Sequence, residues 1–339
     1  MIARQKKNCK FTTLFIKAMF ERERISPAAQ FAILLGLVGA GIFIGGIITI
    51  FIAASYLHVS IFTLAGNVKL IESNVGLSRI LQAVGSFFMI AVPAIVFAFI
   101  VERKRAIPEM GFTNALSGKQ MLFIVLIGVA AIWVSDGLGI FNEWIPLPKN
   151  SETYFKKLEK TYDDEAVAIL TMKSASDYII SLIVIALLPA LFEEMLFRGC
   201  LQKIMISWTR NAFIGILIAS ILFSAFHASY YGFLPRLFLG IVLGYIYYYS
   251  KNIWLNITMH FLNNAFQVTA IYSLARNGQS AQDALSNEKI PVLNILLFVA
   301  MGTVALYFLF GLFKKESELV ISMKTLERMR DDNDPNNLL

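Results

Sequence analysis

Residues 31–57 read FAILLGLVGAGIFIGGIITIFIAASYL, and this run contains no charged side chain. As a helix with a rise of ~1.5 Å per residue, it is long enough to cross the ~30 Å hydrocarbon core of a bilayer. The chain of 339 residues is 57% hydrophobic and 16% charged, whereas about a quarter of the residues of a soluble domain are charged. Because backbone groups in lipid must be hydrogen-bonded internally, the run predicts a membrane-spanning helix.

Seven further apolar runs of similar character follow along the chain. They are Ile80–Val101, Met121–Phe141, Tyr178–Phe197, Ala212–Tyr230, Phe233–Ser250, Asn252–Ala275 and Ile290–Phe313. Together with Phe31–Leu57 they predict an all-α fold, a polytopic transmembrane helix bundle of about eight spans. The lipid bilayer is therefore an expected partner of the chain.

The distribution of basic residues predicts the orientation of this bundle. Twenty Lys and Arg residues lie in the tails and loops on the side of the N terminus, nine lie on the opposite side, and Arg236 lies within a span. Because basic loops stay in the cytoplasm, we expect both termini there, in a multi-pass protein of the cell inner membrane or plasma membrane. This pattern also explains the net charge of +7, so no nucleic-acid partner is predicted.

The sequence predicts one membrane domain with a polar tail at each end. The basic cytoplasmic tail covers residues 1–30, the membrane domain 31–313 and the polar cytoplasmic tail 314–339. Residues 142–177 form an extracytoplasmic insert, whose amphipathic stretch 154–170 is expected to lie on the outer membrane surface. The C-terminal tail is expected to begin as a short helix and to end in disorder.

Two pairs of glycines with the spacing Gly-x-x-x-Gly fall inside predicted spans. They are Gly41 with Gly45, and Gly240 with Gly244. Small residues at this spacing let a neighbouring helix approach closely in lipid. We therefore interpret both pairs as helix-packing sites.

The fourth predicted span ends in the sequence FEEMLFR at residues 192–198. Ionisable side chains inside spans cost ~2.5–3.5 kcal/mol each even on the mildest insertion scale, so each requires a reason. Glu194 and Arg198 are four residues apart with the acid first, the favourable order for a helical ion pair. Glu193 points about 100° away and lacks a local partner, as suits a general base. The alternative is that both acids lie in water at a helix end.

Two of the three histidines in the chain, His227 and His260, fall within predicted spans. His260 and Asn264 are four residues apart and share one helix face. Both histidines also have structural explanations. A lone histidine on an apolar helix is often a buried residue with its hydrogen bonds formed inside the protein, and His260 with Asn264 also fits an interhelical hydrogen bond. Combined with Glu193, the set favours hydrolysis: a base activates water, one imidazole holds it, and the second imidazole with the amide stabilises an oxyanion.

The predicted spans contain two further charged residues, and zinc is a possible ligand of the same region. Asp136 and Arg236 also lie within predicted spans, and we interpret them as structural or cavity-lining. Glu193, His227 and His260 are a ligand set that zinc accepts, but the HExxH motif is absent and the three residues come from separate helices. The preferred mechanism therefore requires no cofactor, and a zinc-dependent version is the alternative.

Three motifs occur in the order of a known family: Glu193-Glu194-x-x-x-Arg198, Phe223-x-x-x-His227 and His260-x-x-x-Asn264. Over residues 178–275 the chain resembles the CPBP family of intramembrane proteases, named for CAAX prenyl proteases and bacteriocin-processing enzymes and also called the Abi family. The resemblance implies that Glu193 activates water, that His227 shares this water and that His260 with Asn264 stabilises the oxyanion. The rest of the first motif has a supporting role. Members have been described both as zinc metalloproteases and as metal-free glutamate proteases.

The expected function is cleavage of a membrane-associated peptide or protein, from a water-filled cavity that opens towards the cytoplasm. A non-catalytic membrane scaffold and a proton-coupled transporter are the alternatives, although no inverted repeat supports transport. One geometric condition must hold. Glu193 lies near the cytoplasmic end of its predicted span and His227 nearer the outer end of the next, so the two meet only if the second span enters the bilayer several residues after Ala212.

Overall fold

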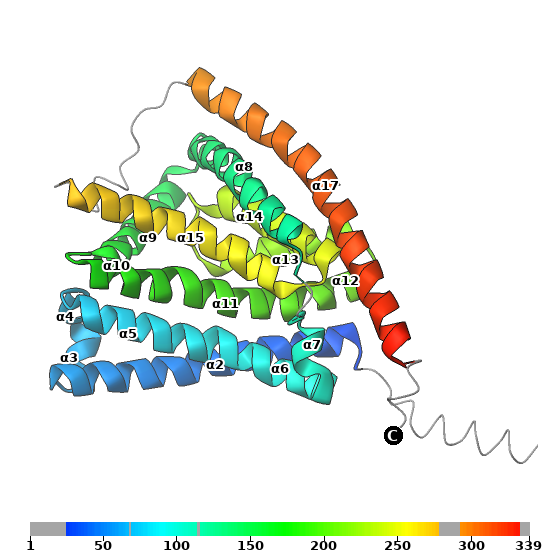
Figure 1. Cartoon of the computed structure of the whole chain (residues 1–339). Coiled ribbons are helices and arrows are strands. Elements are labelled where there is room, and N and C mark those ends of the chain that lie inside the picture. Colours follow the sequence, from blue (N-terminus) through cyan, green and yellow to red (C-terminus); the bar gives the residue numbers. More distant parts are fainter. Residues whose placement is uncertain (1–24, 68, 114–115, 278–291, 333–339) are drawn as a thin grey trace, which may run out of the picture.

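A computed structural model describes residues 25–67, 69–113, 116–277 and 292–332 (Figure 1). Within these residues every regular element is helical, so the predicted all-α fold is confirmed. The first nine elements are α2 (Pro27–Leu57), α3 (Ile61–Gly66), α4 (Lys69–Glu72), α5 (Val75–Ser86), η1 (Phe87–Ala91), α6 (Val92–Glu102), η2 (Arg103–Arg105), α7 (Ala106–Glu109) and α8 (Gly118–Glu143).

The second half of the chain carries the candidate site. Its elements are α9 (Lys149–Leu170), α10 (Ala175–Ser181), η3 (Leu182–Leu187), α11 (Leu188–Glu194), η4 (Met195–Gln202), α12 (Lys203–Thr209), α13 (Ala212–Phe226), α14 (Phe233–Ser250), α15 (Ile253–Arg276) and α17 (Val292–Asp332). The elements α10 to α12 follow one another without a break and form one rod from Ala175 to Thr209, in which η3 and η4 are π-helical turns. We call it the central rod.

The helices stack around this central rod. Figure 1 shows α2 beside α5 and α6 on one side, α11 and α15 in the middle, and α8 with α17 on the other side. Helices α13 and α14 pack against each other and against the central rod. The candidate site is therefore enclosed by helices from both halves of the chain.

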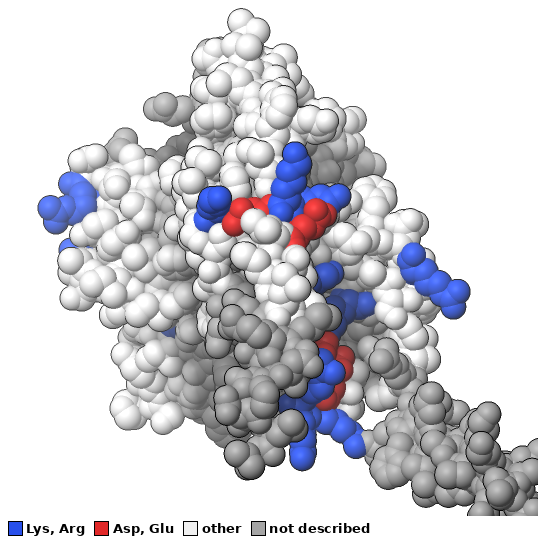
Figure 2. Space-filling view, turned by 45° about the vertical axis from the view of Figure 1, so that its right-hand side comes forward, with Lys and Arg blue, Asp and Glu red and all other residues white. Residues whose placement is uncertain are grey.

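Five helices are long and apolar enough to cross a membrane: Pro27–Leu57, Val75–Glu109, Gly118–Glu143, Ala175–Thr209 and Val292–Leu326. The other three predicted spans are also helical, as α13, α14 and α15. Large apolar side chains point outward, as expected for a lipid-facing surface; Phe43, for example, is 70% exposed. In Figure 2 the charged side chains of one face gather in a few clusters between broad uncharged areas. The chain is a multi-pass membrane protein.

The end of the fourth span was predicted wrongly. We expected it at Phe197, because Arg198 looked like the first charge of a cytoplasmic loop. Instead the central rod continues to Thr209, and Arg198 lies in its interior with only 2% of its surface exposed. The charge did not end the helix because it is paired with Glu194 inside the protein.

The C-terminal tail begins as a helix, as predicted, but this helix is longer than expected and continues the last span. No break separates the last span from the tail, because α17 is a single helix of 41 residues. Its polar half packs on the start of α8, where the Ser117 hydroxyl lies 2.7 Å from Glu316 and the Gln120 amide donates to Ser317 over 3.1 Å. These contacts keep the chain helical beyond the apolar run. The residues for which we expected disorder lie outside the described part of the chain. Residues 1–24 of the N-terminal tail also lie outside it.

The insert at 142–177 contains the predicted amphipathic helix, which runs from Lys149 to Leu170 as α9. Arg79 of α5 fixes its end, because the guanidinium donates to the carbonyls of Ile169 and Thr171 and to the Asp177 carboxylate, over 2.9–3.1 Å. Phe155 of α9 stacks on Tyr230, with ring centroids 5.0 Å apart. The helix is thus attached to the bundle beside the site.

The predicted helix-packing role of the glycine pairs is confirmed. A Cβ atom built on Gly41 would lie 2.5 Å from the carbonyl oxygen of Phe88, and one on Gly240 would lie 2.9 Å from the Cβ of Ser220. Both glycines therefore allow helices to approach more closely than alanine would permit.

Replacing Gly41 by Ala should destabilise the protein by about 1–3 kcal/mol, because the new methyl group overlaps a backbone atom of the neighbouring helix and the helices must move apart. Gly39→Ala is the matched control, since a Cβ there meets nothing within 4 Å. The control should be neutral or slightly stabilising, because alanine favours the helix by up to about 1 kcal/mol. Unfolding in mixed detergent micelles measures both; equal stability of the two variants would contradict the packing role.

Candidate active site

Glu193 and Glu194 lie in the middle of the central rod, at the junction of α11 and the π-helical turn η4. Both are buried, with 8% and 0% of their surface exposed. A π-helical turn shifts the direction of side chains around it and is frequent at functional sites. The two adjacent acids therefore face different neighbours.

The extension of the central rod brings Glu193 to the level of His227. Glu193 precedes the end of the rod at Thr209 by 16 residues, and His227 follows the start of α13 at Ala212 by 15 residues. At ~1.5 Å per residue both lie roughly 23 Å from the turn between the two helices. Glu193 and His227 therefore meet although α13 starts at Ala212, because the fourth span is longer than predicted; the later entry of the next span that the sequence seemed to require is not needed.

The predicted ion pair between Glu194 and Arg198 is confirmed. The Arg198 Nη1 atom donates to Glu194 Oε1 over 2.8 Å, and its Nη2 atom donates to the Gly240 carbonyl of α14 over 3.1 Å. The guanidinium also lies 4.7 Å from the centre of the Phe223 ring. One buried cation thus links the central rod to α13 and α14.

Glu194 also orients His260, which the sequence did not predict. The Nδ1 atom of His260 lies 2.9 Å from the same Glu194 Oε1 that Arg198 contacts. Since this carboxylate is ionised by its pairing with Arg198, Nδ1 is the donor and carries the proton. The other ring nitrogen of His260, Nε2, is thereby turned towards Glu193.

His227 is oriented in the same way by the backbone. Its Nδ1 atom lies 2.9 Å from the carbonyl oxygen of Phe223, which only accepts hydrogen bonds, so Nδ1 carries the proton. In the neutral form of each ring the Nε2 lone pair is therefore available. These two nitrogens face a common point.

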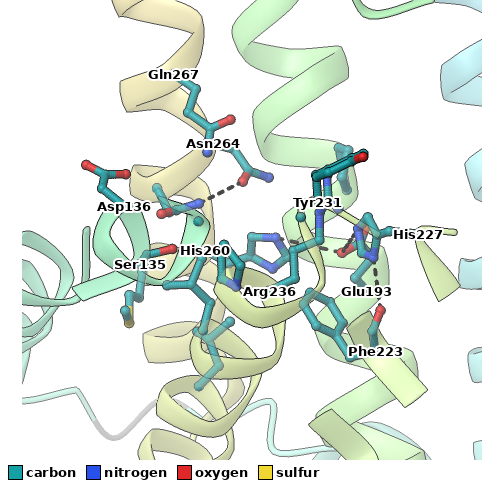
Figure 3. A pocket seen from close by; sticks show the side chains of 18 of the residues that line it. Ser135, Asp136, Glu193, Phe223, His227, Tyr231, Arg236, His260, Asn264 and Gln267 are labelled. Atoms are coloured by element: carbon teal, nitrogen blue, oxygen red, sulfur yellow. Dashed lines mark hydrogen bonds and ion pairs between the residues drawn. The ribbon is translucent and has the colours of Figure 1, made fainter. Parts of the chain in front are cut away.

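That point is the Oε2 atom of Glu193 (Figure 3). It lies 3.7 Å from Nε2 of His260 and 4.0 Å from Nε2 of His227. Both separations are too long for direct hydrogen bonds. Oε2 is buried and accepts no hydrogen bond from any residue in the described part of the chain. The gap between these three atoms is a site for a water molecule, which can donate one hydrogen bond to Glu193 and one to a histidine.

Asn264 lines the same cavity one helical turn after His260. Its Oδ1 atom accepts a hydrogen bond of 3.3 Å from Nδ2 of Asn263, so its own Nδ2 atom points away from Asn263. Among the described residues none accepts a hydrogen bond from this nitrogen. The amide is thus a donor that a substrate oxygen in the cavity can use.

The cavity around these residues has a volume of about 760 Å³. Its wall includes Glu193, His227, His260 and Asn264 together with Gln82, Ser135, Asp136, Glu143, Tyr231, Arg236 and Gln267. Asp136 and Arg236 are cavity-lining, as the sequence indicated. The polar residues of five helices and one loop converge on this space, and a neighbouring cavity of about 450 Å³ also reaches Gln82, Glu193 and His227. Convergence on the same few residues favours a reaction site over a transport path.

The direction of the cavity corrects one expectation. The cavity extends from Glu193 to Glu143, the last residue of α8, and to Gly232, the residue before α14. This is the end of the bundle to which α9 is attached, opposite the end with the start of α2. The expected opening on the side of the N terminus is therefore wrong, because the cavity-facing polar side chains lie in the other half of α8 and α15.

Comparison with known proteins supports the predicted family for one segment of the chain. Residues 175–266 match the family model "Rce1-like: Type II CAAX prenyl endopeptidase Rce1-like". This segment is Rce1-like. No curated protein and no solved structure matches the chain. The match confirms the predicted family, whose members are endopeptidases, and with it the predicted class of peptide-bond hydrolase.

The Rce1-like segment contains all six residues predicted for the site: Glu193, Glu194, Arg198, His227, His260 and Asn264. Several cavity residues were not predicted from the sequence. Gln267 follows His260 by seven residues on the same helix face, so helical spacing was sufficient to find it. Gln82 reaches the cavity from α5, outside the Rce1-like segment, and nothing in its local sequence marks it.

Zinc fits the Rce1-like site poorly. The two Nε2 atoms and Glu193 Oε2 are suitable donors, and both rings are held through Nδ1 as in many metal sites. However, separations of 3.7 and 4.0 Å exceed the ~3.4 Å between two ligands of a tetrahedral zinc ion. In the described residues no group of three His, Cys, Asp or Glu is close enough to hold a metal ion. The description as a metalloprotease is therefore not supported.

Proposed function

We propose that the chain is an intramembrane endopeptidase that hydrolyses peptide bonds with a glutamate-activated water. One observation carries the proposal: the buried Glu193 carboxylate, without a counter-ion of its own, faces the Nε2 atoms of two histidines whose tautomers are set by other groups. A carboxylate so placed is a general base, and the His227 imidazole orients the same water.

In the proposed reaction Glu193 accepts a proton from the water, and His227 Nε2 accepts the hydrogen bond of its second proton. The hydroxide formed attacks the carbonyl carbon, and negative charge moves to the carbonyl oxygen. Asn264 Nδ2 donates a hydrogen bond to this oxygen. His260 donates a second one when its Nε2 atom is protonated, and Glu194 stabilises this imidazolium through Nδ1. The C–N bond then breaks, and Glu193 returns the proton to the leaving amine.

The substrate class follows from the location and the family. We propose a membrane-associated peptide or protein, since the cavity lies between membrane-spanning helices. The family description names CAAX prenyl endopeptidases, which makes prenylated peptides the first substrates to try. No nucleic-acid partner is proposed.

The topology is part of the proposal. We propose eight spans, both termini in the cytoplasm, and a location in the cell inner membrane or plasma membrane, supported by the excess of Lys and Arg on the side of the N terminus. In this orientation the cavity extends towards the extracytoplasmic face. Substrate segments on that face would then reach Glu193 through the cavity.

Purified protein in detergent should cleave peptides of a quenched hydrophobic pool, and His227→Asn should lower the rate by about 10²-fold because the water loses one acceptor. His58→Asn is the matched control, since His58 lies in the turn after α2 at a positive φ of 53° that asparagine tolerates. A chelator should leave the rate unchanged. No cleavage by the wild type, or equal rates in wild type and His227→Asn, would refute the proposal; a chelator effect reversed by zinc would restore the zinc version.

A further inference from the structure

Asp136 of α8 is a charged residue of the cavity for which the reaction gives no role. It lies inside the membrane-spanning helix Gly118–Glu143, seven residues before its end. A carboxylate at this depth is costly unless it faces water or a partner. Its side chain is exposed to the cavity, so the cavity supplies that water.

No residue in the described ranges forms an ion pair or hydrogen bond with Asp136. Two other acids near the site do have partners. Glu194 is paired with Arg198, and Glu159 accepts a hydrogen bond from Ser229. Arg236, a cation of the same cavity, folds back over Gly232, where its Nη1 atom occupies the space that a Cβ there would need. Asp136 is thus a carboxyl group that no described residue pairs with.

Asp136 and the reacting groups share one cavity. Figure 3 shows Asp136 on the side of Asn264 and Gln267, with His260 between it and Glu193. The volume of about 760 Å³ lies within the range of ~300–1,000 Å³ that ligand sites occupy, enough for a few residues of a peptide. A peptide with its carbonyl at Glu193 therefore places neighbouring side chains within the space that Asp136 faces.

We propose that Asp136 is a specificity-determining residue that selects substrates carrying a lysine or arginine side chain close to the scissile bond. A cationic side chain would supply the missing partner through a charge-assisted hydrogen bond, which is stronger than a bond between neutral groups. A substrate with an acidic residue at that position would meet like charge and be rejected. This inference rests on the proposed endopeptidase function, whose site it extends.

Two arms test the proposal separately from the reaction itself. The first arm measures kcat/KM on quenched peptides in which each position is replaced in turn by Lys, Gln or Glu. The wild type should prefer Lys over Gln at one position by about 10- to 100-fold. Asp136→Asn, which keeps the shape and removes the charge, should abolish this preference, and Asp136→Lys should favour Glu. Glu152→Gln is the control, since Glu152 lies on α9 outside the cavity.

The second arm measures binding of the same labelled peptides to Glu193→Gln, with and without Asp136→Asn, by fluorescence anisotropy. This binding measurement needs no turnover. If the wild type cleaves no peptide, the endopeptidase function is refuted, but the binding measurement still shows whether Asp136 selects cationic peptides. Tighter binding of Lys peptides only when Asp136 is present supports the proposal. Equal affinity for Lys and Gln peptides, including no measurable binding of either, overturns it, as does a Lys preference that survives Asp136→Asn.

Discussion

Replacing Glu193 by Gln should lower kcat for peptide hydrolysis by about 10²- to 10⁴-fold, the usual contribution of a general base. The amide has nearly the shape of the carboxylate but accepts no proton from water. The Oε2 atom that faces both histidines has no other hydrogen-bond partner among the described residues, so no neighbouring group compensates for its loss. The measurement is steady-state kinetics on a cleaved peptide.

The fold should survive this substitution. Removing a buried charge that lacks its own counter-ion relieves a desolvation cost, so the unfolding midpoint of Glu193→Gln should equal or exceed that of the wild type. Glu193→Asp provides a graded comparison, because it keeps the charge but withdraws it by one methylene from the two imidazoles. A Gln variant with wild-type kcat would remove Glu193 from the mechanism.

Replacing Arg198 by Ala should destabilise the protein by about 3–5 kcal/mol, the cost of leaving one member of a buried ion pair without its partner. Arg198 and Glu194 are 2% and 0% exposed, and the Gly240 carbonyl would lose its donor as well. Arg198→Lys should recover only part of the loss, because an ammonium cannot reproduce the planar fork that joins Glu194 Oε1 to Gly240. Unfolding in mixed micelles measures the effect.

The chain offers a matched control for this prediction. Arg105 and Glu109 form another Arg–Glu pair with a spacing of four residues and a distance of 2.7 Å, but the Arg105 side chain is 78% exposed. Arg105→Ala should therefore change stability by no more than about 1 kcal/mol. Similar losses for Arg198→Ala and Arg105→Ala would contradict the assigned burial. The double variant Glu194→Gln with Arg198→Met should be more stable than Arg198→Ala, since it leaves no unpaired charge.

Part of this site was predictable because its rules are local. The spacing of Glu194 and Arg198 predicted their ion pair, and the spacing of His260 and Asn264 placed both on one helix face. The length of the apolar runs and the need to satisfy backbone groups in lipid predicted the all-α fold. Each of these inferences uses only residues of one continuous stretch of the chain.

The rest depended on contacts between distant segments. Arg198 looked like a loop residue because its effect on the helix depends on burial, which local sequence does not reveal. The tail after Phe313 stays helical because residues near Ser117, far away in the chain, bind it. The contact between Glu194 and His260 spans 66 residues, and Gln82 belongs to a helix outside the family segment. No periodicity links such positions.

The central rod gives the site a particular mode of failure. Glu193, Glu194 and Arg198 belong to one uninterrupted helix, and His260 on α15 is the counterpart of both acids. If heat or detergent separates these two helices, the imidazole loses its orienting carboxylate and its place beside the base in the same event. Inactivation should then be all-or-none for each molecule, so a damaged sample contains fewer competent molecules and no population with intermediate turnover.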